Sequence, residues 1–328
     1  MAAAIVAGVT PRARVFSLVV LAAAVASGIV VIGVLATRSH IPAPKLRPGR
    51  PPLALDLGLR SDPEARALER AQVLYNRGRP KSAAAVFLGR GSLEAQVGAA
   101  LADWPDGSLT RLRALAASHP RSALVALHLG LALYWSHRDA EAATAWRAAI
   151  AVQPDTPYAV RASDFLHPRF APGLPIFVPS FPPPLRIRVL APERQLEELA
   201  LAAANGGAEA KILYGVALQR LGRPRSAEAQ FAAAARAAPN DPEARAAAAV
   251  GLFDKANPSL AFGRLGPLTR TFPHAQTVRF HLGLMLLWMA QVSQARKELR
   301  LARAEDPGSP LGKQASAYLG ALRSFGTR

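Results

Sequence analysis

Residues 280–307 read FHLGLMLLWMAQVSQARKELRLARAEDP, a leucine-rich apolar stretch followed by a stretch that mixes alanine and leucine with charged residues and ends at a proline. Pro307 follows Pro273 by 34 residues, and Pro273 follows Pro239 by the same interval. Pro120 and Pro154 repeat this spacing earlier in the chain. Proline cannot continue a helix, so each proline marks a predicted helix end. A fixed period of this length predicts an all-α solenoid of stacked helical hairpins.

A second pattern recurs within this period. An apolar–glycine pair is followed by an alanine, by a large apolar residue four positions later, and by the proline. The matched sets are Leu129-Gly130, Ala142, Trp146 and Pro154; Tyr214-Gly215, Ala227, Phe231 and Pro239; and Leu282-Gly283, Ala295, Leu299 and Pro307. A looser unit ends at Pro273, and degenerate units cover residues 64–90 and 91–122. The pattern resembles the tetratricopeptide repeat (TPR) family, although the tryptophan that this family places before the glycine is absent.

The repeats are themselves duplicated. His128-Leu129-Gly130-Leu131 recurs as His281-Leu282-Gly283-Leu284, 153 residues later. Gly78–Ala83 is similar to Gly222–Ala227 at an offset of 144 residues. We therefore predict two TPR-like modules, residues 61–167 and 191–325, each with about three hairpins and a closing helix. Residues 310–325 form the predicted capping helix of the second module.

Residues 168–190 form a proline-rich linker between the modules. They read PRFAPGLPIFVPSFPPPLRIRVL, with phenylalanine, leucine, isoleucine and valine between the prolines. A solvated linker is normally polar, so these apolar side chains require a surface to pack against. We hypothesise that the linker lies against a groove of its own chain or across the module junction.

The N-terminal part of the chain contains a predicted transmembrane helix. Residues 1–14 form a short basic tail, and residues 15–37 are uncharged and long enough to span a bilayer. A cleaved signal peptide is the alternative for this segment. Residues 38–60 are rich in proline and are predicted to be an extended spacer. We expect a single-pass membrane protein with the repeats outside the cytoplasm, although the flanking arginines leave the opposite orientation open.

Charge and cysteine content narrow the choice of partners. The formal net charge is +18, which favours anionic partners, but the basic residues are scattered rather than clustered in long runs. The chain has no cysteine, which excludes disulfides and thiolate chemistry. Nucleic acid is not an expected partner on this basis, yet charge alone leaves it open.

No catalytic or cofactor motif is found in the sequence. It lacks the GxSxG, GxxxxGK[ST] and HExxH patterns, and we predict no enzyme, no cofactor and no metal site. His128 and His281 occupy equivalent positions in the two modules and invite a metal interpretation. A metal site requires three or four converging ligands, so a repeated packing histidine is the preferred interpretation.

The TPR resemblance implies a peptide-binding groove lined by the first helix of each hairpin. Carried onto this chain, the groove positions are apolar and end in an aromatic residue, a residue type enriched in binding hot spots. They are Leu127, Leu131, Tyr134 and Trp135 in the first module, and Phe280, Leu284, Leu287 and Trp288 in the second. The alternative is that these side chains pack against neighbouring helices as core.

These features predict a non-catalytic, membrane-anchored scaffold that binds a protein partner through its TPR grooves. The alternative is a basic helical array that binds an anionic polymer or lipid through charge. Salt separates the two, because charge-driven binding weakens steeply as salt rises whereas apolar docking does not.

Overall fold

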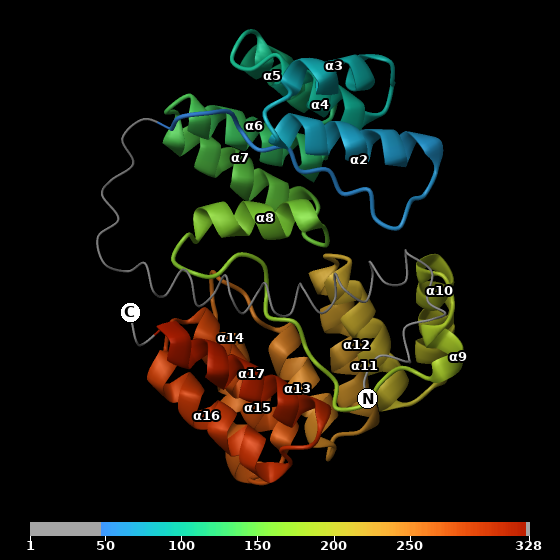
Figure 1. Ribbon diagram of the computed structural model, residues 1–328, viewed down its shortest axis with the longest axis vertical. Helices are drawn as coiled ribbons and strands as arrows, with labels where there is room; N and C mark the ends of the chain where they lie inside the picture. The colour runs from blue at the N-terminus through green and yellow to red at the C-terminus, as the bar shows by residue number, and fades with distance from the viewer. Residues whose placement is uncertain (1–46, 326–328) are drawn as a thin grey trace. The chain divides into compact units, whose positions relative to one another are not determined.

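The computed structural model describes residues 47–325, which form sixteen helices without a β-strand (Figure 1). Among these residues, no helix combines the length and the apolar character needed to cross a bilayer. The transmembrane helix predicted at residues 15–37 lies outside the described part of the chain. The described residues form two compact units, residues 47–168 with Leu221–Arg223, and residues 169–220 with 224–325.

The first unit contains three helical hairpins and a closing helix. The hairpins are α2 (Pro63–Asn76) with α3 (Pro80–Leu88), α4 (Leu93–Ala102) with α5 (Ser108–Ser118), and α6 (Ala123–Trp135) with α7 (Asp139–Val152); α8 (Pro157–Leu166) closes the unit. Helix starts follow local capping rules. The side chains of Asp62 and Thr156, which stand just before Pro63 and Pro157, each accept a hydrogen bond from the backbone N–H three residues later in the chain.

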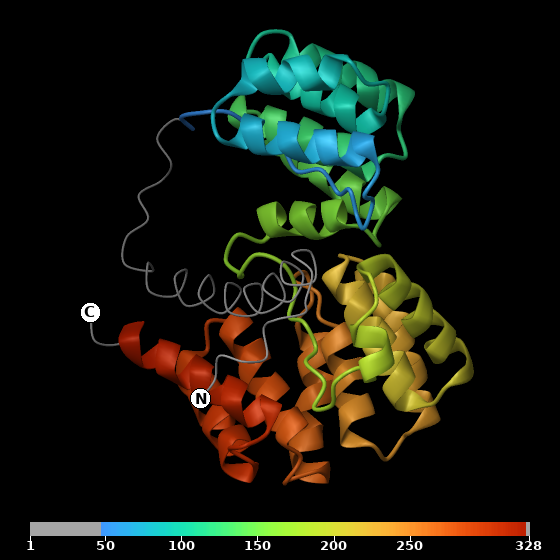
Figure 2. The ribbon, with the colours of Figure 1, turned by 45° about the vertical axis from the view of Figure 1, so that its right-hand side comes forward.

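The second unit repeats this order after two additional helices, and Figure 2 shows its hairpins stacked side by side. The additional helices are α9 (Leu185–Arg188) and α10 (Pro192–Asn205). The hairpins are α11 (Ala208–Arg220) with α12 (Pro224–Ala237), α13 (Pro242–Gly251) with α14 (Ser259–Thr271), and α15 (Gln276–Trp288) with α16 (Val292–Glu305); α17 (Pro310–Phe325) closes the unit. The bounds of α15 and α16 lie 153 residues beyond those of α6 and α7, the offset seen in the sequence.

The periodic prolines mark helix ends as predicted. Pro239, Pro273 and Pro307 each stand two residues after the last residue of α12, α14 and α16. Pro120 and Pro154 stand at the same distance from the ends of α5 and α7. The all-α, repeated-hairpin architecture is therefore confirmed for residues 47–325.

Glycines let the two helices of a hairpin approach closely. A Cβ placed on Gly130 of α6 would overlap the indole of Trp146 on α7. A Cβ on Gly215 of α11 would likewise overlap the ring of Phe231 on α12. The large apolar residue of the repeat thus packs directly over the glycine of the same repeat, which explains why the two occur at a fixed spacing.

Candidate peptide-binding grooves

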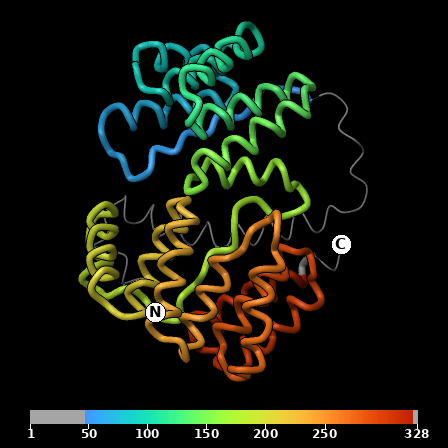
Figure 3. Tube along the Cα trace, turned by 180° about the vertical axis from the view of Figure 1, so that it is seen from behind, coloured from blue at the N-terminus to red at the C-terminus, as the bar shows by residue number. Residues whose placement is uncertain are grey.

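Each unit contains an extended segment of its own chain held along its helices. We call Pro51–Asp56 the first strap and Pro175–Ser180 the second strap. Figure 3 shows the second as a green tube without helical turns that passes between the α11–α12 hairpin and the later hairpins. Proline favours such an extended backbone, and an extended backbone cannot satisfy its own N–H and C=O groups. Their partners therefore come from the helices.

The first strap is bound through its backbone by three helices, α2, α6 and α8. Its carbonyl at Pro51 accepts a hydrogen bond from the Tyr75 hydroxyl at 2.8 Å. The amide of Asn76 on α2 contacts both backbone groups of Leu53, accepting from its N–H at 3.0 Å and donating to its C=O at 2.8 Å. Two further strap N–H groups, those of Leu55 and Asp56, donate to Gln72 on α2 and to the Tyr158 hydroxyl on α8. The remaining contact is made by α6.

A buried histidine makes that contact. Nδ1 of His128 lies 2.7 Å from the Leu124 carbonyl one helical turn earlier, so Nδ1 carries the proton and donates. Nε2 is then unprotonated and accepts a hydrogen bond from the Ala54 N–H at 3.1 Å. Burial lowers the pKa of His128 to about 4, with a smaller contribution from the positive charge of Arg161. The imidazole is neutral at pH 7, which is the state that this contact requires.

The second strap is bound at the same places by the second unit. Gln219 on α11 accepts from the Phe177 N–H at 2.9 Å and donates to the Pro175 carbonyl at 3.4 Å. Nδ1 of His281 donates to the Thr277 carbonyl, and its Nε2 accepts from the Val178 N–H at 2.9 Å. Burial lowers the pKa of His281 to about 4 as well.

The second strap ends at a buried carboxylate. Glu243 on α13 accepts hydrogen bonds from the N–H of Ser180 at 2.7 Å and from its hydroxyl at 3.1 Å. Only 8% of Glu243 is exposed, and burial raises the pKa of its carboxyl despite these donors. Hydrogen bonds from Ser180 and from the Thr277 side chain offset part of the cost of burying this carboxyl group.

The two straps correspond residue by residue at an offset of 124. The pairs are Pro51 and Pro175, Leu53 and Phe177, Ala54 and Val178, and Asp56 and Ser180. In both straps the first and third residues are buried, and the second and fifth are partly exposed. Over the first three positions this is the alternation of an extended peptide that presents every second side chain to a groove, and the fifth residue departs from it.

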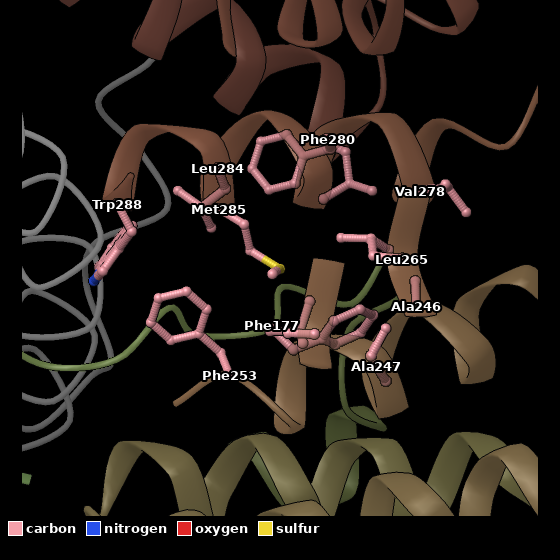
Figure 4. Packing of buried hydrophobic residues seen from close by; sticks show 14 of the residues in the cluster. Phe177, Ala246, Ala247, Phe253, Leu265, Val278, Phe280, Leu284, Met285 and Trp288 are labelled. Atoms are coloured by element: carbon pink, nitrogen blue, oxygen red, sulfur yellow. The ribbon is translucent and has the colours of Figure 1, made fainter. Parts of the chain in front are cut away.

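The buried strap residues occupy apolar pockets in their units. Phe177 stacks on the His281 ring with the centroids 4.1 Å apart and the planes 11° apart. Figure 4 shows Phe177 within the cluster that contains Phe253, Phe280 and Met285. Leu53 belongs in the same way to the apolar cluster of the first unit, with Leu127 and Leu131. Aromatic stacking and apolar burial thus supplement the backbone hydrogen bonds.

Six of the eight predicted partner-binding side chains are buried in these clusters. They are Leu127, Leu131, Phe280, Leu284, Leu287 and Trp288. Tyr134 and Trp135 are partly buried, and Tyr134 packs on Trp146 with 5.6 Å between the ring centroids. The structure places these positions in the same apolar clusters as helix partners and straps, so contact with a separate partner stays a prediction.

Two interpretations of the sequence change with this geometry. Residues 38–60 are assigned to a spacer by their prolines, whereas residues 51–56 are bound within the first unit. The hypothesis that the linker 168–190 packs against its own chain is confirmed, and its C-terminal part forms the short helix α9. Both histidines use both ring nitrogens in hydrogen bonds within their units, which accounts for their repeated position without a metal.

Comparisons with known proteins add little to this description. No family model matches the chain, and no curated protein matches it. A search of solved structures matches the "Assembly Chaperone of RpL4 (Acl4) (Residues 1-338)" at 16% identity, over 81% of this chain and all of that one. The TM-score of 0.26 is too low to support a conclusion about function.

Proposed function

We propose that this protein is a non-catalytic, TPR-like scaffold whose grooves bind extended segments of a protein partner. One observation supports the proposal. Both grooves form hydrogen bonds with the backbone of an extended strap at matched positions, and in each a neutral histidine accepts from the N–H of the fourth strap residue. Recognition of main-chain groups together with alternate side chains is how peptide-binding domains hold extended ligands. The sequences of the two straps suggest the kind of peptide that each groove would accept.

The fitting segment has a proline, a large apolar residue two positions later, and a small or branched apolar residue after that. These features are shared by PPLALD at residues 51–56 and PIFVPS at residues 175–180. We propose that a partner segment of this pattern displaces the strap. A tethered strap has an effective concentration in the range of about 1 mM, so a free peptide of equal intrinsic affinity competes only at similar concentrations.

The test therefore opens the groove first. In one variant, residues 51–56 are replaced by glycine and serine. A fluorescein-labelled peptide of residues 48–58 is then titrated into the variant and into the unchanged protein, and fluorescence anisotropy is recorded. Binding in the micromolar range is expected for the opened groove only. Circular dichroism checks that the helices remain folded in the variant.

Two matched controls separate groove binding from adhesion to a basic protein. The peptide with Leu53→Asp and the opened variant with His128→Ala should each bind at least about tenfold more weakly, because a buried contact or hydrogen bond is lost. The proposal would be refuted if the opened variant is folded but does not bind the peptide, or if it binds the Leu53→Asp peptide as tightly as the unchanged peptide.

Membrane anchoring is a separate part of the proposal. Residues 15–37 would anchor the scaffold, with the repeats outside the cytoplasm, and the hydrophobic length of this segment supports the idea. Protease treatment of cells carrying a C-terminal tag tests the orientation. Cleavage of the tag in cells with a permeabilised envelope and an intact inner membrane agrees with this placement, whereas cleavage only after full lysis contradicts it.

A further inference from the structure

Helices α16 and α17 enclose a cleft lined by arginine. Arg296, Arg300 and Arg303 follow one another on a single face of α16, and Arg323 comes from the last turn of α17. The two helices are labelled in Figure 1. Leu319 is buried at the base of the cleft, whose volume of about 130 Å³ is several times that needed for one water molecule. The cleft is therefore large enough for a small anion.

The positive charge in the cleft is not neutralised by the carboxylates nearest in sequence. Glu298 forms an ion pair with Arg279 at 3.0 Å, and Glu305 lies 3.4 Å from a nitrogen of His274. The carboxylate of Asp306 accepts hydrogen bonds from backbone N–H groups at the start of α17. Among residues 47–323, no ion pair involves any of the four cleft arginines.

Arg296 is oriented by the protein but not fully satisfied. Its guanidinium donates to the Leu322 carbonyl near the end of α17. Its Nε is buried and has no hydrogen-bond partner. A buried donor without a partner destabilises the folded protein, so an acceptor that reaches this nitrogen is favoured.

The first unit shows that packing does not require these arginines. Helix α7 is the counterpart of α16 at the offset of 153, and its buried residues Ala142, Trp146 and Ala149 match Ala295, Leu299 and Ala302. The positions equivalent to Arg296, Arg300 and Arg303 are Ala143, Arg147 and Ile150. The same helix pair thus forms with a single arginine on this face, so its packing does not need the two additional arginines of α16.

We propose that the α16–α17 cleft binds a phosphate group. The planar guanidinium fork matches the oxygens of a phosphate through paired hydrogen bonds, and several forks converge here in one concave site. The group can belong to a soluble phosphate compound or to an anionic phospholipid headgroup, which share this chemistry. The cleft is distinct from the two strap grooves and independent of the function proposed for them.

Calorimetric titration with inorganic pyrophosphate tests the soluble source. Sedimentation with vesicles of phosphatidylglycerol, compared with phosphatidylcholine, tests the headgroup. Arg300→Gln and Arg303→Gln should each weaken whichever binding is seen by about tenfold or more, since each removes a charge-assisted contact. Arg147→Gln is the matched control, because it removes the same charge from the equivalent helix and should leave binding within about twofold.

The outcomes are decisive. Pyrophosphate binding that depends on Arg300 without selective vesicle binding assigns a soluble phosphate, and Arg300-dependent preference for phosphatidylglycerol assigns the lipid. Binding of neither ligand overturns the proposal. Equal losses in Arg300→Gln and Arg147→Gln also overturn it, because the effect would then follow net charge rather than this cleft. Binding of a nucleic acid or an acidic peptide through Arg300, with no response to either phosphate ligand, overturns it as well.

Discussion

The two straps occupy the same places in their units with different side chains around them. Asn76 and Gln219 both hold the third strap residue, and a histidine on the first helix of the third hairpin holds the fourth. At the sixth residue the first unit offers the phenol of Tyr158 from α8, whereas the second offers the carboxyl of Glu243 from α13. The comparison teaches that the histidine acceptor is retained in both units, whereas the acceptor of the sixth strap residue differs in both its helix and its chemistry.

The anchoring side chain also differs between the straps. Leu53 fills the first groove through aliphatic contacts, whereas Phe177 fills the second and adds a stacked contact with His281. A larger, fully buried aromatic side chain removes more apolar area from water. The second strap is therefore expected to be held more tightly than the first.

Truncation of the two anchors gives the largest expected effect. Phe177→Ala should lower the free energy of unfolding by ~4 kcal/mol and Leu53→Ala by ~3 kcal/mol, as for other buried side chains of these sizes. Urea unfolding monitored by circular dichroism measures both values. Limited proteolysis shows whether the strap has left its groove, since a released strap exposes its backbone. Equal and small losses in the two variants would contradict the inferred difference between the straps.

Much of this fold follows from local sequence rules. The prolines at 34-residue spacing mark where helices end, because proline lacks the N–H and the geometry needed to continue them. Gly215 and Phe231 match the repeat because one ring fits only where the facing residue has no side chain. Packing of the apolar linker against its own chain could also be predicted, since burial of large apolar residues such as Phe177 is favourable.

Binding of the first strap in a groove could not be predicted from the sequence, for a physical reason. Its prolines predict an extended backbone correctly, but extension is equally compatible with a solvated spacer and with a bound peptide. The groove acceptor for Ala54 is His128, 74 residues away, and a hydrogen bond to a backbone N–H imposes no side-chain pattern. The available signal was weak: the offset of 124 between the two straps, alongside the repeated histidine.

The two units should also differ in their response to acid. The pKa of each histidine is lowered from 6.5 to about 4 in the folded protein. Its neutral ring therefore contributes fully to the free energy of unfolding above pH 6.5, and this contribution is lost as the pH falls towards 4. The free energy of unfolding falls by up to ~3 kcal/mol for each histidine, because the ring binds a proton in the unfolded chain but stays unprotonated when it is buried. Protonation of Nε2 also removes the acceptor of the strap N–H.

Glu243 opposes this loss in the second unit only. Its folded pKa is raised, so it stabilises the fold at low pH and loses that contribution as the pH rises through the folded value. Acidification from pH 7 to 4.5 should therefore release the first strap before the second. Hydrogen exchange of the strap amides, followed by nuclear magnetic resonance across this range, measures the order. In Glu243→Gln the pH interval between release of the first and the second strap should narrow, and only the difference due to Phe177 should remain. An unchanged interval in this variant, or release of the second strap first in the unchanged protein, would refute the role given to Glu243.

The smallest expected effect concerns the turn inside the third hairpin of each unit. His137 and Ala290 occupy equivalent positions with φ of 60° and 59°, the left-handed region that favours glycine. Gly78 and Gly222 fill the corresponding turn in the first hairpin of each unit, with φ of 80° and 68°. The third hairpins thus contain a backbone strain that the first hairpins avoid.

Relief of this strain should stabilise both units by a similar amount. Ala290→Gly and His137→Gly are each expected to raise the free energy of unfolding by about 0.5–1 kcal/mol, the steric gain at positive φ less the greater entropy of glycine in the unfolded chain. Urea unfolding of the two single variants and the double variant measures the gains, which should add if the turns are independent. A gain in one unit alone would show that His137 or Ala290 makes a compensating contact through its side chain, and would end the equivalence of the two turns.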